Sequence, residues 1–316
     1  MNTLKGCYVV IWREFVRCEL YHSDFNSYFC ISLEFVYMNK EEKLERAVVK
    51  VVDDMMQRVL DKVLVTEPFD ELNHHQFKPL YAALVPDEIF KGAYFERRFV
   101  TPFGLVWEKL AIAAGYVNHG LCLEGHTVTG TINSERLRRI QEVLDSLEHK
   151  AEGRDAKKPN WNEELKYIMA GGGDPVAQAV VCDIYIDSQT TGKKYSFELK
   201  APLPNSDQTK VSKEKMFKLL AMNEHPIDEA YYALPYNPYG ANRADYDWSF
   251  PKRWFDMVND PCVLIGDDFW NLIGGPGTYE FFIKEMNKLG ADYKKRIYRE
   301  YLGVEPPEDM EQSWLK

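Results

Sequence analysis

The stretch that decides the fold runs from Ala179 to Lys200. It opens with AVVCDIYI (Ala179–Ile186), continues with DSQTTGKK (Asp187–Lys194) and ends with YSFEL (Tyr195–Leu199) followed by Lys200. The outer two segments are rich in β-branched and aromatic residues, which favour strands. The middle segment carries turn residues. The stretch therefore predicts an antiparallel hairpin.

The segments after this hairpin predict more strands alternating with helices. Ser206–Met222 has the pattern of a lysine-faced helix. Its expected apolar stripe is Val211, Met216, Leu219 and Leu220. Strands are expected at Ala230–Leu234 and Cys262–Ile265, and helices at Phe269–Ile273 and Tyr279–Leu289.

The segments before the hairpin predict mainly helices. An amphipathic helix follows Met38, a buried helix is expected at Phe103–Gly115, a third begins at Ser134, and a fourth covers Trp161–Ala170. Between the first two, Pro68, Pro79 and Pro86 break the chain into short pieces. Together these elements predict an α/β fold, a mixed sheet with helices on both faces.

The first 37 residues differ from the rest, with three of the six cysteines and no sustained period. We expect residues 1–37 to be a non-native extension upstream of a true start at Met38. The alternative is a short arm that packs on the fold. Residues 38–316 are expected to form a single domain, with a helical N-terminal part (38–165) and a catalytic core (166–300).

Composition bounds the class of protein. The chain has 316 residues, 45% of them apolar, and a net charge of −10. The apolar fraction excludes global disorder. The negative net charge excludes a protein that coats nucleic acid through its overall charge, but it does not exclude a local basic cleft. No apolar run approaches the ~20 residues of a membrane helix, and no CxxC pair is present. A cytoplasmic protein without structural zinc or disulfides is expected.

Three charged residues of the hairpin carry the predicted chemistry. Glu198 and Lys200 are two apart in a strand, so both side chains leave the same face. Asp183 lies in the partner strand, where pairing can place it beside Glu198. Two carboxylates and a backbone carbonyl suit Mg²⁺, and a lysine beside such a metal can orient a water for phosphodiester hydrolysis. The alternative is a structural salt bridge between Lys200 and one carboxylate, which leaves the other carboxylate unexplained.

The run from Phe197 to Gln208 resembles a known family of enzymes. Asp183 followed by FELK (Phe197–Lys200) resembles the catalytic core of the PD-(D/E)xK nuclease superfamily, and APLPNSDQ (Ala201–Gln208) resembles the segment that follows in type II restriction endonucleases. Blocks around 95–111, 233–239 and 268–279 resemble the TdeIII-type group of these enzymes. The departure is that no proline precedes Asp183; Asp174, next to Pro175, is the rival, but it lies in a glycine turn.

The resemblance implies roles for these residues. Asp183, Glu198 and the Leu199 carbonyl would hold the metal, and Lys200 would orient the water. A further carboxylate from a preceding helix is assigned to Glu108, with an ion pair to Lys109 or an arginine as the alternative. Gln208 would hold Lys200 or a phosphate, or would simply begin its helix.

Contacts with DNA are expected from the segments after the hairpin. Lys210, Lys213 and Lys218 are candidates for phosphate contacts, although lysines on a helix are often only a solvated face. Asn205 is a further candidate. The long loop Tyr236–Arg253, with Arg243, is the candidate for groove contacts.

The function these residues predict is sequence-specific cleavage of double-stranded DNA with Mg²⁺. A two-fold target implies a homodimer, and a restriction-modification system implies a cognate DNA methyltransferase as a functional partner. The resemblance suggests a GGNCC-like target. The alternatives are a structure-specific or repair nuclease of the same superfamily and a non-catalytic DNA-binding module.

Overall fold

The structure is a computed structural model that describes residues 38–148 and 157–307. The described residues from Ala47 onward belong to one compact unit. The predictions about residues 1–37 lie outside the described residues.

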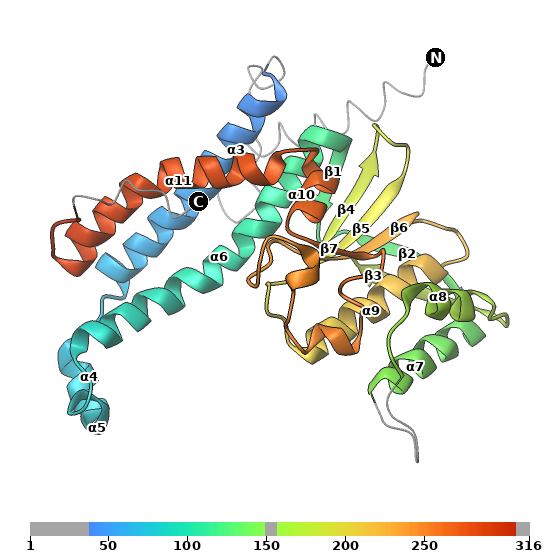
Figure 1. The fold of residues 1–316 in the computed structure, drawn as a ribbon, viewed down its shortest axis with the longest axis horizontal. Coiled ribbons are helices and arrows are strands. Elements are labelled where there is room, and N and C mark those ends of the chain that lie inside the picture. The colour runs from blue at the N-terminus through green and yellow to red at the C-terminus, as the bar shows by residue number, and fades with distance from the viewer. Residues whose placement is uncertain (1–37, 149–156, 308–316) are drawn as a thin grey trace. The chain divides into compact units, whose positions relative to one another are not determined.

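A five-stranded mixed sheet forms the centre of this unit (Figure 1). Its order is β1 (Gly120–Glu124), β4 (Ile184–Ser188), β5 (Lys194–Leu199), β6 (Glu229–Leu234) and β7 (Val263–Ile265). The pairs β1–β4 and β4–β5 are antiparallel, and β5–β6 and β6–β7 are parallel. The predicted α/β fold and its central hairpin are therefore confirmed.

A two-stranded ribbon extends the first half of that sheet. β2 (Thr127–Asn133) pairs with β3 (Pro175–Val181) in the same antiparallel register that joins β1 to β4. At the interruption the Gly125 N–H donates to the Asp183 carbonyl (3.0 Å), and the Cys182 N–H donates to the His126 carbonyl (2.9 Å). The prediction of one strand over 179–186 was wrong, because the ladder bends here and leaves Asp183 between two strands. β1 and β2 were not predicted.

Two helices cover one face of the sheet. α6 (Asp87–His119) packs against β1 and β4, and α10 (Asp267–Gly274) lies beside its C-terminal part (Figure 1). The predicted end of this helix at Gly115 was wrong. A Cβ at Gly115 would meet the Cys122 sulfur at 2.6 Å, so this glycine permits close packing on β1. The helix ends instead at Gly120, whose φ is +93°.

The breaks predicted at Pro68, Pro79 and Pro86 are present, and two of these prolines lie at the start of a helix. Pro79 is the first residue of α5 (Pro79–Ala82), which follows α4 (Glu71–Phe77), and Pro86 is the N-cap of α6. Proline suits a helix start because its missing N–H would be unbonded there in any case. α6 also continues through Pro102.

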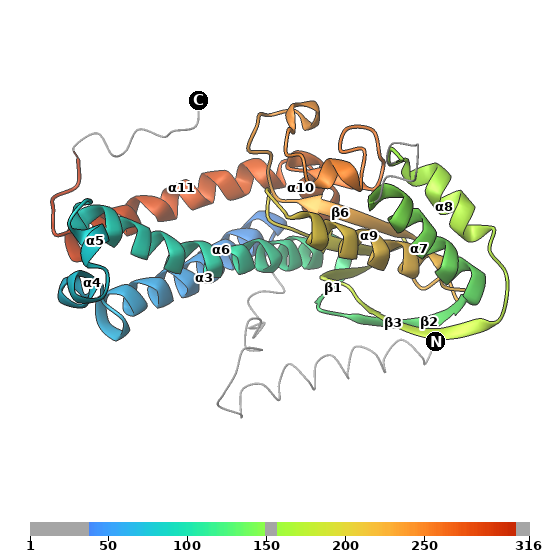
Figure 2. The ribbon, with the colours of Figure 1, turned by 90° about the horizontal axis from the view of Figure 1, so that it is seen from below.

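The other face of the sheet is covered by α9 (Ser206–Ala221), with α7 (Ser134–Glu148) and α8 (Trp161–Met169) packed on it (Figure 2). Trp161 stacks on Phe217 of α9 with ring centroids 4.6 Å apart, and Tyr232 of β6 stacks on Phe255 at 4.7 Å. The predicted stripe of α9 needs one correction, because Val211 is 53% exposed.

The remaining elements are helical. They are α3 (Lys40–Asp61), α11 (Thr278–Arg296), two π-helical turns (Lys62–Thr66 and Ile297–Leu302) and two 3₁₀ turns (Arg243–Asp245 and Pro251–Arg253). The Tyr293 hydroxyl of α11 donates to Asp53 of α3 at 2.7 Å. In the part of the chain that the structure describes, no helix is long and apolar enough to cross a membrane.

Candidate active site

Asp183, Glu198 and Lys200 meet where β5 ends beside the bend before β4. The Lys200 Nζ donates to Asp183 Oδ2 and lies 3.4 Å from Glu198 Oε2. Residues two apart in a strand share a face, which explains why Lys200 reaches back over Glu198. The bend supplies Asp183 from the neighbouring strand, so the predicted convergence of these three residues is present.

A second lysine completes this group from the other side. Lys215 of α9 forms an ion pair with Glu198 Oε1, and its Nζ lies 3.3 Å from Asp183 Oδ1. Each of the two ammonium groups therefore spans one oxygen of Asp183 and one oxygen of Glu198. Lys215 was missed from the sequence, because its spacing on the helix does not distinguish it from the other lysines there. We refer to Asp183, Glu198, Lys200 and Lys215 as the acid–lysine cluster.

Burial disfavours the ionised form of Glu198 in this cluster. The Glu198 side chain is 1% exposed, whereas Asp183, Lys200 and Lys215 are about one-fifth exposed. Burial raises the pKa of Glu198, and the Asp183 charge raises it further, while Lys200 and Lys215 oppose both. Burial by itself lowers the pKa of Lys200, but the Glu198 and Asp183 carboxylates outweigh it and the pKa is raised. Lys200 therefore stays protonated, and the ionised form of Glu198 is stabilised by the two neighbouring ammonium groups of Lys200 and Lys215.

Glu108 of α6 is coupled electrostatically to the same cluster. Burial raises the pKa of its carboxyl group, and the charges of Asp183 and Glu124 raise it further. The Lys200 charge lowers the pKa of Glu108 in opposition. A third carboxylate near the centre would show such coupling to Asp183 and Lys200; the role that the resemblance implies for Glu108 stays a prediction.

Gln208 and Asn205 lie at the start of α9. The Asn205 side chain caps the helix by accepting the Gln208 N–H at 2.8 Å. Both residues are exposed. The sequence-based alternative for Gln208, a residue of the helix start, matches its position, and no bond from Gln208 to Lys200 occurs among the hydrogen bonds of the described residues.

Lys213 does not reach the surface, so its predicted contact with DNA phosphates was wrong. Its side chain is 0% exposed and lies 2.5 Å from Glu164 of α8, which is also 0% exposed. The ammonium also donates to the Trp254 carbonyl. Burial lowers the pKa of Lys213, and the Glu164 charge opposes that shift. Lys213 therefore joins α8 to α9 in the core.

The other predicted DNA contacts differ among themselves. Lys210 pairs with Glu148 and Lys218 pairs with Glu214 at 2.7 Å, and both lysines are about one-quarter exposed. They remain available to a phosphate. Arg243 instead donates to the carbonyls of Met257 (2.7 Å) and Asp260 (2.6 Å). Its guanidinium holds the loop together, a structural role in place of the predicted DNA contact.

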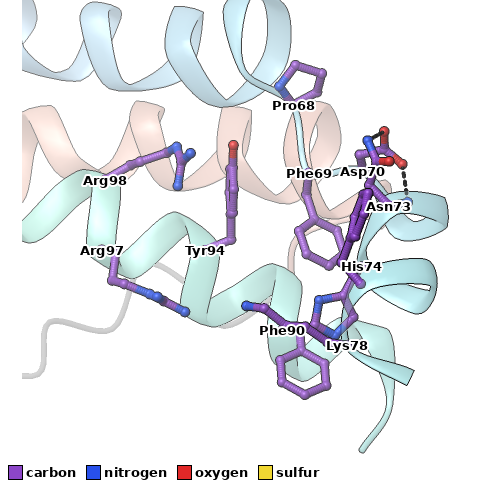
Figure 3. Close-up of a pocket in the computed structure, with 11 residues that line it drawn as sticks. Pro68, Phe69, Asp70, Asn73, His74, Lys78, Phe90, Tyr94, Arg97 and Arg98 are labelled. Carbon is purple, nitrogen blue, oxygen red and sulfur yellow. Dashed lines mark hydrogen bonds between the residues drawn. The ribbon is translucent and has the colours of Figure 1, made fainter. Parts of the chain in front are cut away.

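A cavity of about 440 Å³ lies near the other end of α6 (Figure 3). Arg98 stacks over Tyr94 at 3.3 Å from the ring centroid and pairs with Glu67 at 3.0 Å, while His74 lies against Phe90. Arg98 and Glu108 are ten residues apart in one helix, about 15 Å along its axis. The cavity is therefore separate from the acid–lysine cluster.

The cluster has the donor set for a hard divalent cation. Asp183 and Glu198 offer four oxygens, and Glu198 Oε1 is buried without a hydrogen bond, its contact with Lys215 being an ion pair. Within 38–148 and 157–307, no group of three or more His, Cys, Asp and Glu side chains is gathered closely enough to hold a metal. Mg²⁺ typically uses only one or two protein carboxylates and completes its shell with waters, so this pair fits Mg²⁺.

A mixed sheet that gathers two carboxylates and two lysines at a strand end suits an enzyme acting on a phosphodiester. Comparison with known proteins gives the class directly. The family model described as "Type II restriction endonuclease, HinfI" matches residues 44–290, and the chain belongs to this family. It is therefore a type II site-specific deoxyribonuclease, as the sequence predicted.

Three curated relatives come from Herpetosiphon aurantiacus. The type II restriction enzyme HgiCII is 26% identical over 229 residues, which are 71% of this chain and 82% of HgiCII. The type II restriction enzymes HgiBI and HgiEI are each 26% identical over 230 residues, 71% of this chain and 81% of theirs. The narrower TdeIII-type grouping stays a prediction.

Proposed function

We propose that this enzyme hydrolyses phosphodiester bonds of double-stranded DNA at the acid–lysine cluster, with Mg²⁺ as its cofactor. One observation carries the proposal: Asp183 comes from the bend between β3 and β4 and Glu198 from β5, yet both contact the same two ammonium groups. A carboxylate pair that needs two cations in the resting protein is prepared for a divalent cation.

Asp183 and Glu198, with the backbone carbonyl of Leu199, would hold the metal. When bound, Mg²⁺ lowers the pKa of a water and stabilises the negative charge that develops on the phosphate. The side chains of this chain supply the remaining functions.

Lys200 is the residue that we assign to the attacking water. Its ammonium is 20% exposed, and its pKa is raised by the two carboxylates, so it stays protonated. A protonated lysine can hydrogen-bond the water and the phosphate oxygens and so orient them. Glu108, whose pKa is raised by burial and by the charges of Asp183 and Glu124, is the carboxyl group that we assign to accepting a proton from this water.

Binding of the DNA backbone is assigned to the solvent side of α9. Asn205, Lys210 and Lys218 lie on one helix with Lys215, so phosphates could run along that helix toward the cluster. For the target we propose a GGNCC-like site, on the resemblance described above. A methyltransferase that protects the same site would be the functional partner.

We propose that the working form is a homodimer, because cutting both strands at a two-fold site takes two centres. Six exposed apolar side chains in one segment of the chain support this. They are Leu72, Phe77, Leu80, Tyr81, Leu84 and Ile89, from α4 to the start of α6. Such clusters commonly mark protein interfaces. Sedimentation equilibrium should give a dimer that Leu72→Ser/Leu80→Ser dissociates; a wild-type monomer that cuts both strands would contradict the proposal.

The experiment that tests the function combines a digest of phage DNA with thermal melts. Wild-type protein with Mg²⁺ should give discrete fragments, and the metal-free protein none. Asp183→Asn and Lys200→Met should each lower cleavage by at least ~10³-fold, while both proteins stay folded and bind DNA. A non-specific smear would favour another nuclease activity, and DNA binding without any cleavage would favour a binding module.

The same variants test the salt-bridge alternative. If the cluster were only structural, removing one partner would strand buried charge and cost roughly 3–5 kcal/mol. Both variants would then melt at markedly lower temperature. If both variants stayed folded and kept full cleavage activity, the cluster would not be the catalytic site.

A further inference from the structure

The acid–lysine cluster has more positive charge than a metal-bound centre can keep. Lys200 and Lys215 already neutralise Asp183 and Glu198, and each ammonium spans one oxygen of each carboxylate. A divalent cation added to this arrangement would put four positive charges beside at most three negative ones, those of Asp183, Glu198 and Glu108. Because like charges within a few ångströms repel strongly at low dielectric, one lysine has to leave its carboxylate oxygens when the metal enters.

Lys215 is the lysine that is free to move. Lys200 is two residues from Glu198 on the same strand face, so its backbone stays at the site. Lys215 approaches from α9, between the buried Ser212 and the partly exposed Lys218 one turn further on. The two side chains are about equally exposed, 20% for Lys200 and 22% for Lys215, so the distinction rests on their elements. Lys215 reaches the carboxylates from a different element, and its flexible four-carbon stem can turn away from them toward solvent.

We infer that Lys215 is a positioning residue that occupies the carboxylate pair in the metal-free enzyme, is displaced by the divalent cation, and then pairs with a DNA phosphate. The inference rests on the proposed function of the cluster. It has an energetic consequence, because a displaced ammonium needs a new anion. DNA supplies that anion, so DNA and metal should each strengthen the binding of the other by the same factor.

The first part of the test measures metal binding without DNA. Isothermal titration of free protein with Mg²⁺ and with Ca²⁺ should show weak binding by the wild type. Lys215→Met should bind both ions at least ~5-fold more tightly, because no ammonium competes for the oxygens. The matched control is Lys193→Met, which removes an ammonium that pairs with Glu229 at the opposite end of β5 and not with the cluster. Its metal affinity should equal that of the wild type.

The second part measures coupling to DNA by fluorescence anisotropy, with a duplex of random sequence and Ca²⁺. Ca²⁺ should raise the duplex affinity of the wild type and of Lys193→Met at least ~10-fold. It should raise that of Lys215→Met less than ~3-fold, because the ammonium that links the two sites is gone. Lys215→Arg keeps the charge and should retain most of the coupling. It is also the variant to compare with wild type if Lys215→Met folds poorly.

Equal or weaker metal affinity in Lys215→Met, or coupling that matches the wild type, would overturn the inference. Either result is distinguishable from failure of the proposed function, in which wild-type protein would cut no DNA with Mg²⁺. A purely structural role for Lys215 would lower the melting temperature and leave the ratio of affinities with and without Ca²⁺ unchanged.

Discussion

Gly125 lies opposite Asp183 in the antiparallel ladder, and its N–H donates to the Asp183 carbonyl at 3.0 Å. Its φ of +61° falls in the left-handed region that favours glycine. The bend that takes Asp183 out of a regular strand therefore depends on a glycine on the opposite side of the ladder, between β1 and β2. This relationship places the first carboxylate of the cluster.

Gly125→Ala should lower both stability and cleavage. A Cβ at Gly125 would meet nothing within 4 Å, so the penalty is conformational, about 1–2 kcal/mol. Relief of that strain would shift Asp183, and we expect cleavage to fall about 10-fold. The control is Gly192→Ala, with φ +71° and open space in the turn between β4 and β5. It should lose the same stability in urea melts and keep full activity; equal loss of activity in both would contradict this role of the bend.

Glu108→Gln should stabilise the protein at neutral pH and lower its activity. Burial, Asp183 and Glu124 raise the pKa of Glu108 in the folded state above its ordinary 4.5. Above the raised pKa the ionised carboxylate costs stability relative to the unfolded chain, and protonation on acidification removes that cost. The melting temperature of the variant should exceed that of wild type by about 2 °C at pH 7.5, and the gap should close toward pH 5.

The control for this pH series is Glu300→Gln. The bond from Arg296 lowers the pKa of Glu300, so its ionised form is the favoured one and its removal should not raise the melting temperature. A lower melting temperature for Glu108→Gln than for wild type at pH 7.5 would contradict this prediction, because it would show that the ionised Glu108 carboxylate stabilises the folded protein.

Lys213→Met should damage the fold and leave DNA contacts alone. It would strand the Glu164 carboxylate in the core, at a cost of roughly 3–5 kcal/mol in urea denaturation. Lys213→Met/Glu164→Met should recover most of that loss, since well-packed apolar residues often replace a buried ion pair without penalty. The slope of DNA affinity against salt should match wild type for the double variant. A shallower salt dependence for the double variant would show that Lys213 contacts a DNA phosphate, contrary to its buried position.

Lys210→Ala should weaken binding to all DNA sequences about equally. If Lys210 leaves Glu148 for a phosphate, its loss should reduce the slope of log affinity against log salt by about 1. Lys193→Ala is the control, because Lys193 pairs with Glu229 at the opposite end of β5 from the cluster. A change in the site that is cut, without a change in the salt slope, would assign Lys210 to base recognition.

The local patterns of the sequence were enough for the hairpin, the helix after it and the pairing of Glu198 with Lys200. Strand side chains alternate with a period of two, so Glu198 and Lys200 share a face whatever surrounds them. Turn residues at 187–194 fix which strands meet. For this reason the pairing of Glu198 with Lys200 followed from the local pattern, whereas the class of enzyme followed from the resemblance of Phe197–Gln208 to restriction endonucleases.

Tertiary structure decided which lysines and carboxylates reach that pair. Lys213 and Lys215 are two positions apart on α9, about 200° around the helix, and only the packing of α8 and β5 against α9 makes one a core residue and the other a member of the cluster. The bend at Asp183 depends on Gly125 across the ladder, a residue 58 positions earlier in the sequence. The places of Lys213, Lys215 and Asp183 are set by contacts between segments that are distant in the sequence, so local sequence patterns cannot predict them.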